Sequence, residues 1–161
     1  MARGRPLEIA AELIEAFERC ARATEYLVER VPPELWRAEP AASGRTIAAI
    51  VAHMQSVRRG HAKLAAGHHV APALDHNSAT QAEAVEALRL SREVLTAQFR
   101  EALARGEARV KGMPRRAVDM ITYLMQHDAH HRGQLTRQAR ELGHRLEEDD
   151  VMRIWGWKKL P

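Results

Sequence analysis

Residues 120–142 read MITYLMQHDAHHRGQLTRQAREL, and this stretch decides the fold class. Its apolar residues recur at steps of three and four, which is the period of an amphipathic helix with one face turned towards a core. The same steps place His127 and His131 on that face, between Leu124 and Leu135. Two imidazoles on a face that should be buried need hydrogen-bond partners or a metal ion, because burying an unpaired polar group is costly.

Three further helical blocks precede this one. The chain is rich in Ala, Leu, Glu and Arg, which favour helices, and no stretch alternates with period two. We expect helices over residues 7–31, 46–66, 78–105 and 114–142, with Gly143 after the last one as its cap. Four such helices predict an all-α, four-helix bundle. The second and third connections are long enough to cross the bundle, so the sequence leaves the topology open.

The length of 161 residues fits one domain that spans residues 1–161. Cys20 is the only cysteine, which excludes an intramolecular disulfide and fits a reducing compartment. No segment approaches the roughly 20 apolar residues of a membrane span. We therefore expect a soluble, cytoplasmic protein. Trp155 and Trp157 follow the last helical block, and two tryptophans in a tail predict that it packs on the bundle.

The net charge of +4 and the pI of about 9.7 raise the question of nucleic-acid binding. The basic residues are spread along the chain and mixed with acidic ones, as in residues 140–141 and 147–150. No basic run carries interleaved aromatic residues. We therefore expect neither a nucleic-acid nor a membrane partner, and a small molecule as the substrate of any activity.

A third histidine strengthens the metal interpretation of the pair. His53 lies between Ile50 and Val57 on the inner side of the second expected helix, and it could supply a ligand from a neighbouring helix. Three histidines with one open position are typical of a reactive metal site rather than a closed structural one. Nitrogen ligands alone do not choose among zinc, nickel, iron, cobalt and manganese. The alternative is that each is a core histidine with a protein partner.

Four neighbours could support the three ligands. His61 has nearly the helical angle of Val57, so it is a fourth ligand, a group behind the ligands or an uninvolved residue two turns away. His130 and Gln134 lie beside the pair in the sequence and are expected behind the ligands or at an interface. Asp128 has two interpretations: the base of a shortened zincin-like motif, or the i,i+4 partner of Arg132.

Gly133 interrupts the same helix, at a cost of about 1 kcal/mol relative to alanine. A close approach of another helix would explain this glycine, and a tolerated defect is the alternative.

Several of these segments together resemble the DinB-like superfamily, the metal-binding bundles typified by damage-inducible DinB and YfiT-type proteins. The matching pieces are Pro-Glu-Leu-Trp at 33–36, Thr46-Ile47 with His53 following, His-Asp-Ala-His-His-Arg-Gly-Gln at 127–134, and Ile-Trp-Gly-Trp at 154–157. The resemblance implies an up-up-down-down bundle, a homodimer and one divalent metal ion bound by His53, His127 and His131. Some relatives are S-transferases or isomerases that use bacillithiol, mycothiol or glutathione.

Three functions remain open from the sequence. The first is a metal-dependent transferase or isomerase with a low-molecular-weight thiol as its second cofactor. The second is a metal-dependent hydrolase with Asp128 as its base. The third is a metal-stabilised stress or interaction protein without catalytic activity.

Overall fold

The structure describes residues 7–40, 43–66 and 71–161. Within this part of the chain lie five α-helices and one short 3-10 turn, joined by loops. The computed structural model has four long helices, α1 (Ile9–Arg30), α2 (Ile47–Ala66), α3 (Gln81–Ala104) and α4 (Ala117–Glu141). A 3-10 turn, η1 (Pro33–Leu35), follows α1, and α5 (Glu148–Ile154) follows α4. These described residues contain no strand, so the expected all-α class is confirmed.

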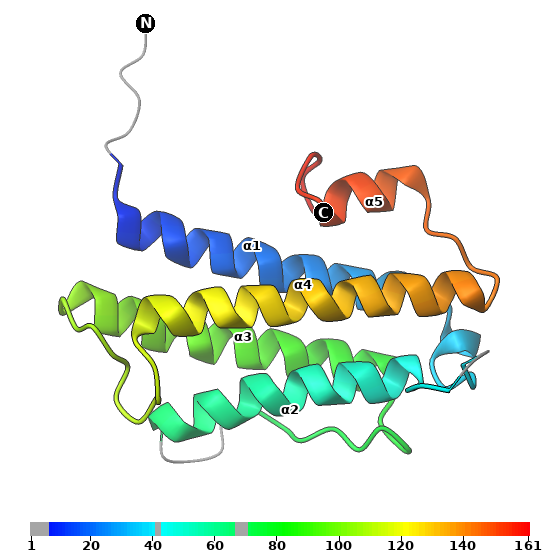
Figure 1. Ribbon diagram of the computed structural model, residues 1–161, viewed down its shortest axis with the longest axis horizontal. Coiled ribbons are helices and arrows are strands. Elements are labelled where there is room, and N and C mark those ends of the chain that lie inside the picture. Colours follow the sequence, from blue (N-terminus) through cyan, green and yellow to red (C-terminus); the bar gives the residue numbers. More distant parts are fainter. Residues whose placement is uncertain (1–6, 41–42, 67–70) are drawn as a thin grey trace, which may run out of the picture.

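The four long helices form a bundle in which α1 and α2 lie at opposite corners. Each of these two packs against both α3 and α4 (Figure 1). Along the chain, α1 and α4 run in one direction and α2 and α3 in the other (Figure 1). The chain order is therefore up, down, down, up. The up-up-down-down order implied by the resemblance appears only when one goes round the bundle from α1 to α4, α2 and α3.

The connection between α2 and α3 accounts for this topology. The Arg59 Nε atom donates to the carbonyl oxygen of Ala71 at 3.1 Å, and the Gln55 Nε2 atom to that of Pro72 at 3.0 Å. Residues 71–80 thus run back along α2, which lets α3 start at the same end as α2. The connection between α3 and α4 is a simple reversal (Figure 1).

The ends of the helices lie within three residues of the expected ones. α3 begins after Thr80, whose hydroxyl accepts from the Glu83 amide in a capping box. α4 begins at Ala117 rather than at Pro114, because the Ala117 amide donates to the carbonyl oxygen of Ala108 at 2.8 Å and closes a turn there. Gly143, with a φ of +89°, ends α4 in a left-handed cap, as expected.

The bundle core divides into two apolar clusters. One contains Val28, Trp36, Ile47, Met54, Leu88 and Leu135, and the other contains Phe17, Leu95, Phe99, Met120, Ile121 and Leu124. Each long helix carries buried polar residues between its contributions to the two clusters. They are Thr24, Glu25, Gln55, Arg58, Ser91 and Asp128. A polar layer therefore crosses the middle of the bundle, at the level where the histidines lie.

The C-terminal segment packs on the bundle, because its helix α5 contacts α1. The Tyr26 hydroxyl donates to the Asp150 carboxylate, and the Arg30 guanidinium lies 3.7 Å from the same group. Trp155 and Trp157 do not take part in this packing, since they are 74% and 77% exposed. The tail thus packs on the bundle through polar contacts of α5 and through Ile154, which lies against the core cluster that contains Val28, while the two tryptophans that suggested this packing stay exposed.

None of the helices in the described part of the chain combines the length and the apolar character that crossing a membrane requires.

Candidate metal centre

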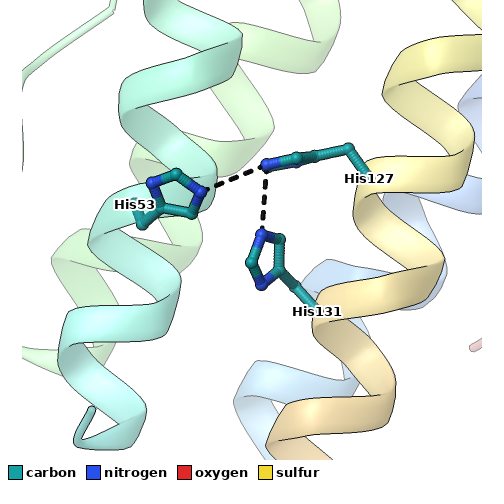
Figure 2. Close-up of side chains that lie close together, drawn as sticks. All are labelled: His53, His127 and His131. Carbon is teal, nitrogen blue, oxygen red and sulfur yellow. Dashed lines mark hydrogen bonds between the residues drawn. The ribbon is translucent and has the colours of Figure 1, made fainter. Parts of the chain in front are cut away.

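Two antiparallel neighbours, α2 and α4, bring three histidines together. His127 and His131 are four residues apart on α4, so both project from one side of that helix. His53 projects from α2 towards the pair, and Figure 2 shows all three rings converging on one point between the helices. The residues that periodicity selects are therefore the residues that the fold brings together.

The distances between the ring nitrogens fit a single metal ion. The Nε2 atom of His127 lies 3.3 Å from that of His53 and 3.1 Å from that of His131. Metal–nitrogen bonds of about 2.05 Å at tetrahedral angles separate two ligand nitrogens by about 3.3 Å. One candidate ligand atom from each histidine lies within 4.8 Å of the others, which is close enough to hold a metal ion.

The protons on these rings favour a metal over a hydrogen-bonded cluster. Since the Gln134 Oε1 atom can only accept, the Nδ1 atom of His131 carries a proton and donates it to Gln134 at 2.7 Å. In the neutral ring, the His131 Nε2 atom then presents a lone pair to the cluster. The His127 Nε2 atom contacts the Nε2 atoms of both His53 and His131, and a single proton on it can be donated well to only one of them. A cation between the rings would instead attract the Nε2 lone pairs of all three histidines.

Burial keeps the three imidazoles neutral. It lowers the pKa of His127 to about 4, and the nearby His131 ring adds to this effect. Burial also lowers the pKa of His53, with a further contribution from the positive charge of Arg45, and burial is the main cause of the lowered pKa of His131. Neutral rings are the form that binds metal ions, so the protein environment prepares the cluster for that role.

The second nitrogens of the rings are not equally supported. Gln134 orients His131, and the His130 Nε2 atom in turn accepts from the Gln134 amide at 3.1 Å. The Nδ1 atom of His127 is buried and has no hydrogen-bond partner among the described residues. Since ligand histidines ordinarily donate from their second nitrogen, His131 is the well-supported member of the pair and His127 the less supported one.

His61 lies away from the cluster. Its Nδ1 atom donates to the carbonyl oxygen of Val57 at 2.8 Å. The Tyr123 ring lies 5.8 Å from the His61 ring and 5.8 Å from the His127 ring, measured between centroids. His61 is not among the three residues that could share an ion, and it contacts the aromatic side chain that borders the cluster.

A cavity opens beside the cluster. Its volume is about 490 Å³, and its lining includes His130, His131, Gln134, Arg45 and Arg137. The Arg137 guanidinium is paired with Glu141 at 2.7 Å. Glu141 lines the cavity as well and offsets the charge of Arg137, so Arg45 is the cation that could hold an acidic group of a small molecule next to the histidines.

Asp128 follows His127 directly, but its carboxylate belongs to the polar layer. Arg58 binds both carboxylate oxygens, through Nη2 to Oδ2 and through Nε to Oδ1, and the Thr24 hydroxyl donates to Oδ2 at 3.0 Å. The expected pairing of Asp128 with Arg132 is wrong, because Arg132 instead donates to the carbonyl oxygen of Cys20 at 3.0 Å.

Arg58 is a strongly interacting residue of this region that the sequence pattern did not indicate, and so is Glu25, which pairs with Arg92 at 2.9 Å. The Arg58 side chain is 0% exposed, and it also contacts Glu25 at 3.8 Å and the carbonyl oxygen of Leu88 at 3.2 Å. Burial opposes its charge, but Asp128 and Glu25 outweigh burial and raise the pKa of the guanidinium. The pair of Arg58 and Asp128 links α2 to α4, the two helices that carry the histidines.

The fold and the cluster define a class of protein: an all-helical bundle with three convergent histidines, contributed by two helices, that can hold a metal ion. The model of the DinB family matches residues 5–158, and the chain belongs to the DinB family. The family expected from the motifs is thus confirmed over nearly the whole chain. No curated protein matches the sequence.

Proposed function

We propose that the chain binds one divalent metal ion through His53, His127 and His131 and acts as a metal-dependent S-transferase or isomerase on a small thiol. The observation that carries this proposal is the convergence of three Nε2 atoms at 3.1 and 3.3 Å beside a cavity of about 490 Å³. Three protein ligands leave room for a substrate atom at the metal.

A divalent metal ion held there would lower the pKa of a thiol ligand, which is the chemistry that thiol transfer requires. The chain's own residues supply the rest. Gln134 holds His131 in the tautomer that presents Nε2 to the cluster. Arg45 lines the cavity and would attract a carboxylate on the thiol or on its reaction partner.

The hydrolase alternative is less well supported by the contacts of Asp128. A base beside the first ligand histidine needs a carboxylate that can reach a water at the metal. Both oxygens of Asp128 instead accept hydrogen bonds within the polar layer, from Arg58 and Thr24. Replacing Asp128 is therefore expected to affect folding first, and no specific observation favours hydrolysis.

The first test is the metal content of the untagged protein. We expect about one metal ion per chain, lost in His53→Ala and in His131→Ala and retained in His76→Ala. His76 is an exposed histidine in the connection between α2 and α3, which makes it a matched control. Retention of the metal in both cluster variants, or its loss in the control alone, contradicts the proposed site.

The second test addresses the thiol. With cobalt as the metal, glutathione or cysteine should produce a sulfur-to-cobalt charge-transfer band, and S-methylglutathione should not. A cobalt spectrum that no thiol changes, in a protein that holds one cobalt ion, rules out the transferase mechanism. It leaves a metal that serves stability alone, the third function open from the sequence. The homodimer stays a prediction, which light scattering tests.

A further inference from the structure

A second cavity lies on the side of α4 that faces α1. Its volume is about 760 Å³, and its walls come from α1, α4, the end of α5 and the segment that follows α5. Figure 1 shows α5 and the C-terminal residues lying beside α1 and α4, away from α2. The size is that of a site for a small molecule, and no residue of the three-histidine cluster lines it.

Aromatic and apolar side chains form one wall of this cavity. Trp155 and Trp157 both line it, with Ile154 before them and Met125 of α4 across from them. The two indoles contribute little to the core, since they are 74% and 77% exposed. Two tryptophans that remain exposed around one cavity offer flat apolar faces to a ligand, a use that bundle packing does not explain.

The charged side chains that line the cavity are all positive, although Glu15, outside the lining, lies 3.9 Å from Arg19. Its lining carries the cationic side chains of Arg19, Arg22, Arg132, Arg153, Lys158 and Lys159, and no Asp or Glu is among the described residues that line it. Asp149 outside the lining pairs with Arg153 at 2.6 Å and also with Lys158 at 2.5 Å. No carboxylate of the described residues forms an ion pair with Arg22 or Lys159. A concave surface with unpaired cations concentrates anions.

The floor of the cavity holds one of these cations in place without neutralising it directly. The Arg132 Nη1 atom donates to the carbonyl oxygen of Cys20 at 3.0 Å and to the Thr24 hydroxyl at 3.1 Å, and it lies 3.3 Å from the Cys20 sulfur. The carbonyl and hydroxyl oxygens carry no formal charge. Burial favours the neutral form of the Cys20 thiol as well, because it raises the pKa of this group despite the nearby Arg132. The guanidinium is therefore oriented in advance by neutral groups.

We propose that this cavity binds a small amphipathic anion. Its flat aromatic body would lie against Trp155 and Trp157, and its carboxylate, sulfonate or phosphate would lie near the cations of the lining. The concave shape favours a small molecule over a membrane surface. A second copy of the chain would place one cationic cavity against another in a two-fold contact, which like-charge repulsion disfavours. This site is independent of the metal proposal.

Anilinonaphthalene sulfonate is a suitable probe, because it combines an aromatic body with one anionic group and fluoresces when bound. We expect the full-length protein to bind it at one saturable site. The variant Trp155→Ala/Trp157→Ala, and separately Arg22→Gln/Lys159→Gln, should weaken binding at least tenfold. Lys111→Gln, an exposed residue in the connection between α3 and α4, removes a cation elsewhere and should leave binding unchanged. The uncharged analogue phenylnaphthylamine should bind much more weakly to the wild type.

Each other outcome contradicts the proposal. Unchanged binding in both variants, with helical circular dichroism intact, places the probe elsewhere. Equal affinity for the charged and uncharged probes removes the role of the cations. Co-sedimentation with phosphatidylglycerol vesicles that depends on the two tryptophans, without saturable probe binding, identifies a membrane surface instead. A change from dimer to monomer in the tryptophan variant identifies a second copy as the occupant. The metal content should stay at its wild-type value in both variants, which separates this test from that of the metal site.

Discussion

Two buried polar groups lie side by side in this bundle, and they differ in how they satisfy their hydrogen bonds. Asp128 and Arg58 bind each other, and Thr24 and the carbonyl oxygen of Leu88 take up further bonds. His127 is the residue directly before Asp128. Its Nε2 atom contacts two other imidazole nitrogens, and its Nδ1 atom has no partner among the described residues.

This difference separates a structural role from a ligand role. The hydrogen bonds of Asp128 and Arg58 are satisfied by groups of the protein itself, so this ion pair does not require a ligand. Its loss should lower the stability of the fold. The three imidazoles direct more lone pairs than protons towards one point between the helices. A cation bound at that point would satisfy all of these lone pairs. The predictions below test this contrast, starting with the change that should cost the most stability.

Breaking the ion pair should have the largest effect. Asp128→Asn removes the closer of the two carboxylates that face the fully buried Arg58 and leaves only Glu25 at 3.8 Å, and we expect it to lower the free energy of unfolding by about 3–5 kcal/mol. Urea denaturation of the metal-free protein measures this. Glu86→Gln, which breaks an exposed ion pair with Arg89, is the matched control and should cause no measurable loss.

A double variant sharpens this prediction. Replacing Arg58 and Asp128 together, by methionine and leucine, removes both charges and should recover most of the stability that Asp128→Asn loses. If the single variant is as stable as the wild type, Arg58 is neutralised in another way and its pairing with Asp128 does not stabilise the bundle.

Removing the metal should have the next largest effect. Metal at a hundred times its dissociation constant should raise the free energy of unfolding of the wild type by about 2.7 kcal/mol, since the unfolded chain lacks the site. His53→Ala should show no such increase. Thermal unfolding with added metal and with a chelator measures both. A large loss of stability in His53→Ala under chelator contradicts the idea that this ring acts mainly as a ligand.

The sequence predicted the histidines more completely than the layer beside them. His53, His127 and His131 could be found because each combines a ligand side chain with a position on an apolar helix face. Arg58 was not predicted and the partner of Asp128 was predicted wrongly, because charged residues on helices were interpreted as solvated or as i,i+4 partners.

A usable pattern was nevertheless present for these two. Ile47, Val51, Met54, Arg58 and Ala62 follow one another at steps of three and four, and all five are fully buried. Ile121, Leu124, Asp128, His131 and Leu135 follow the same spacing on α4, and all five are buried. One cation and one anion, each within an apolar stripe, indicate a buried pair between two helices. The pattern does not say which helices are neighbours, so the pairing itself needed the fold.

The fold was predicted at the level of class and helices but not of direction or of how the tail is attached. Helix boundaries follow from periodicity and from caps such as Gly143, which are local. The direction of α3 depends on contacts of residues 71–80 with α2, which are not encoded in any helical period. The exposure of Trp155 and Trp157 depends on where α5 ends, and hydrophobicity alone predicted the opposite.

Removing the support of one ligand should have a smaller effect than removing the ligand. Gln134→Ala takes away the acceptor of the His131 Nδ1 proton, and we expect metal affinity to fall about 10–100-fold. Gln134→Glu keeps an acceptor and should stay near the wild-type affinity. His130→Ala removes only a contact to Gln134 and should have a still smaller effect. Competition with a chromophoric chelator measures all three. Equal affinity in Gln134→Ala and the wild type shows that the other contacts of His131 orient it sufficiently.

The smallest expected effect concerns two glycines that interrupt α2 and α4. Gly60 and Gly133 are exposed, and a Cβ atom at either position would meet no other atom within 4 Å. A close approach within the chain therefore does not explain Gly133. Both Gly60→Ala and Gly133→Ala should raise the free energy of unfolding by about 0.5–1 kcal/mol, because alanine loses less backbone entropy in a helix. Urea denaturation measures each. The comparison matters more than either value: if Gly60→Ala stabilises and Gly133→Ala destabilises, a contact from a second chain covers α4 next to the histidine cluster, and that interface becomes part of the site.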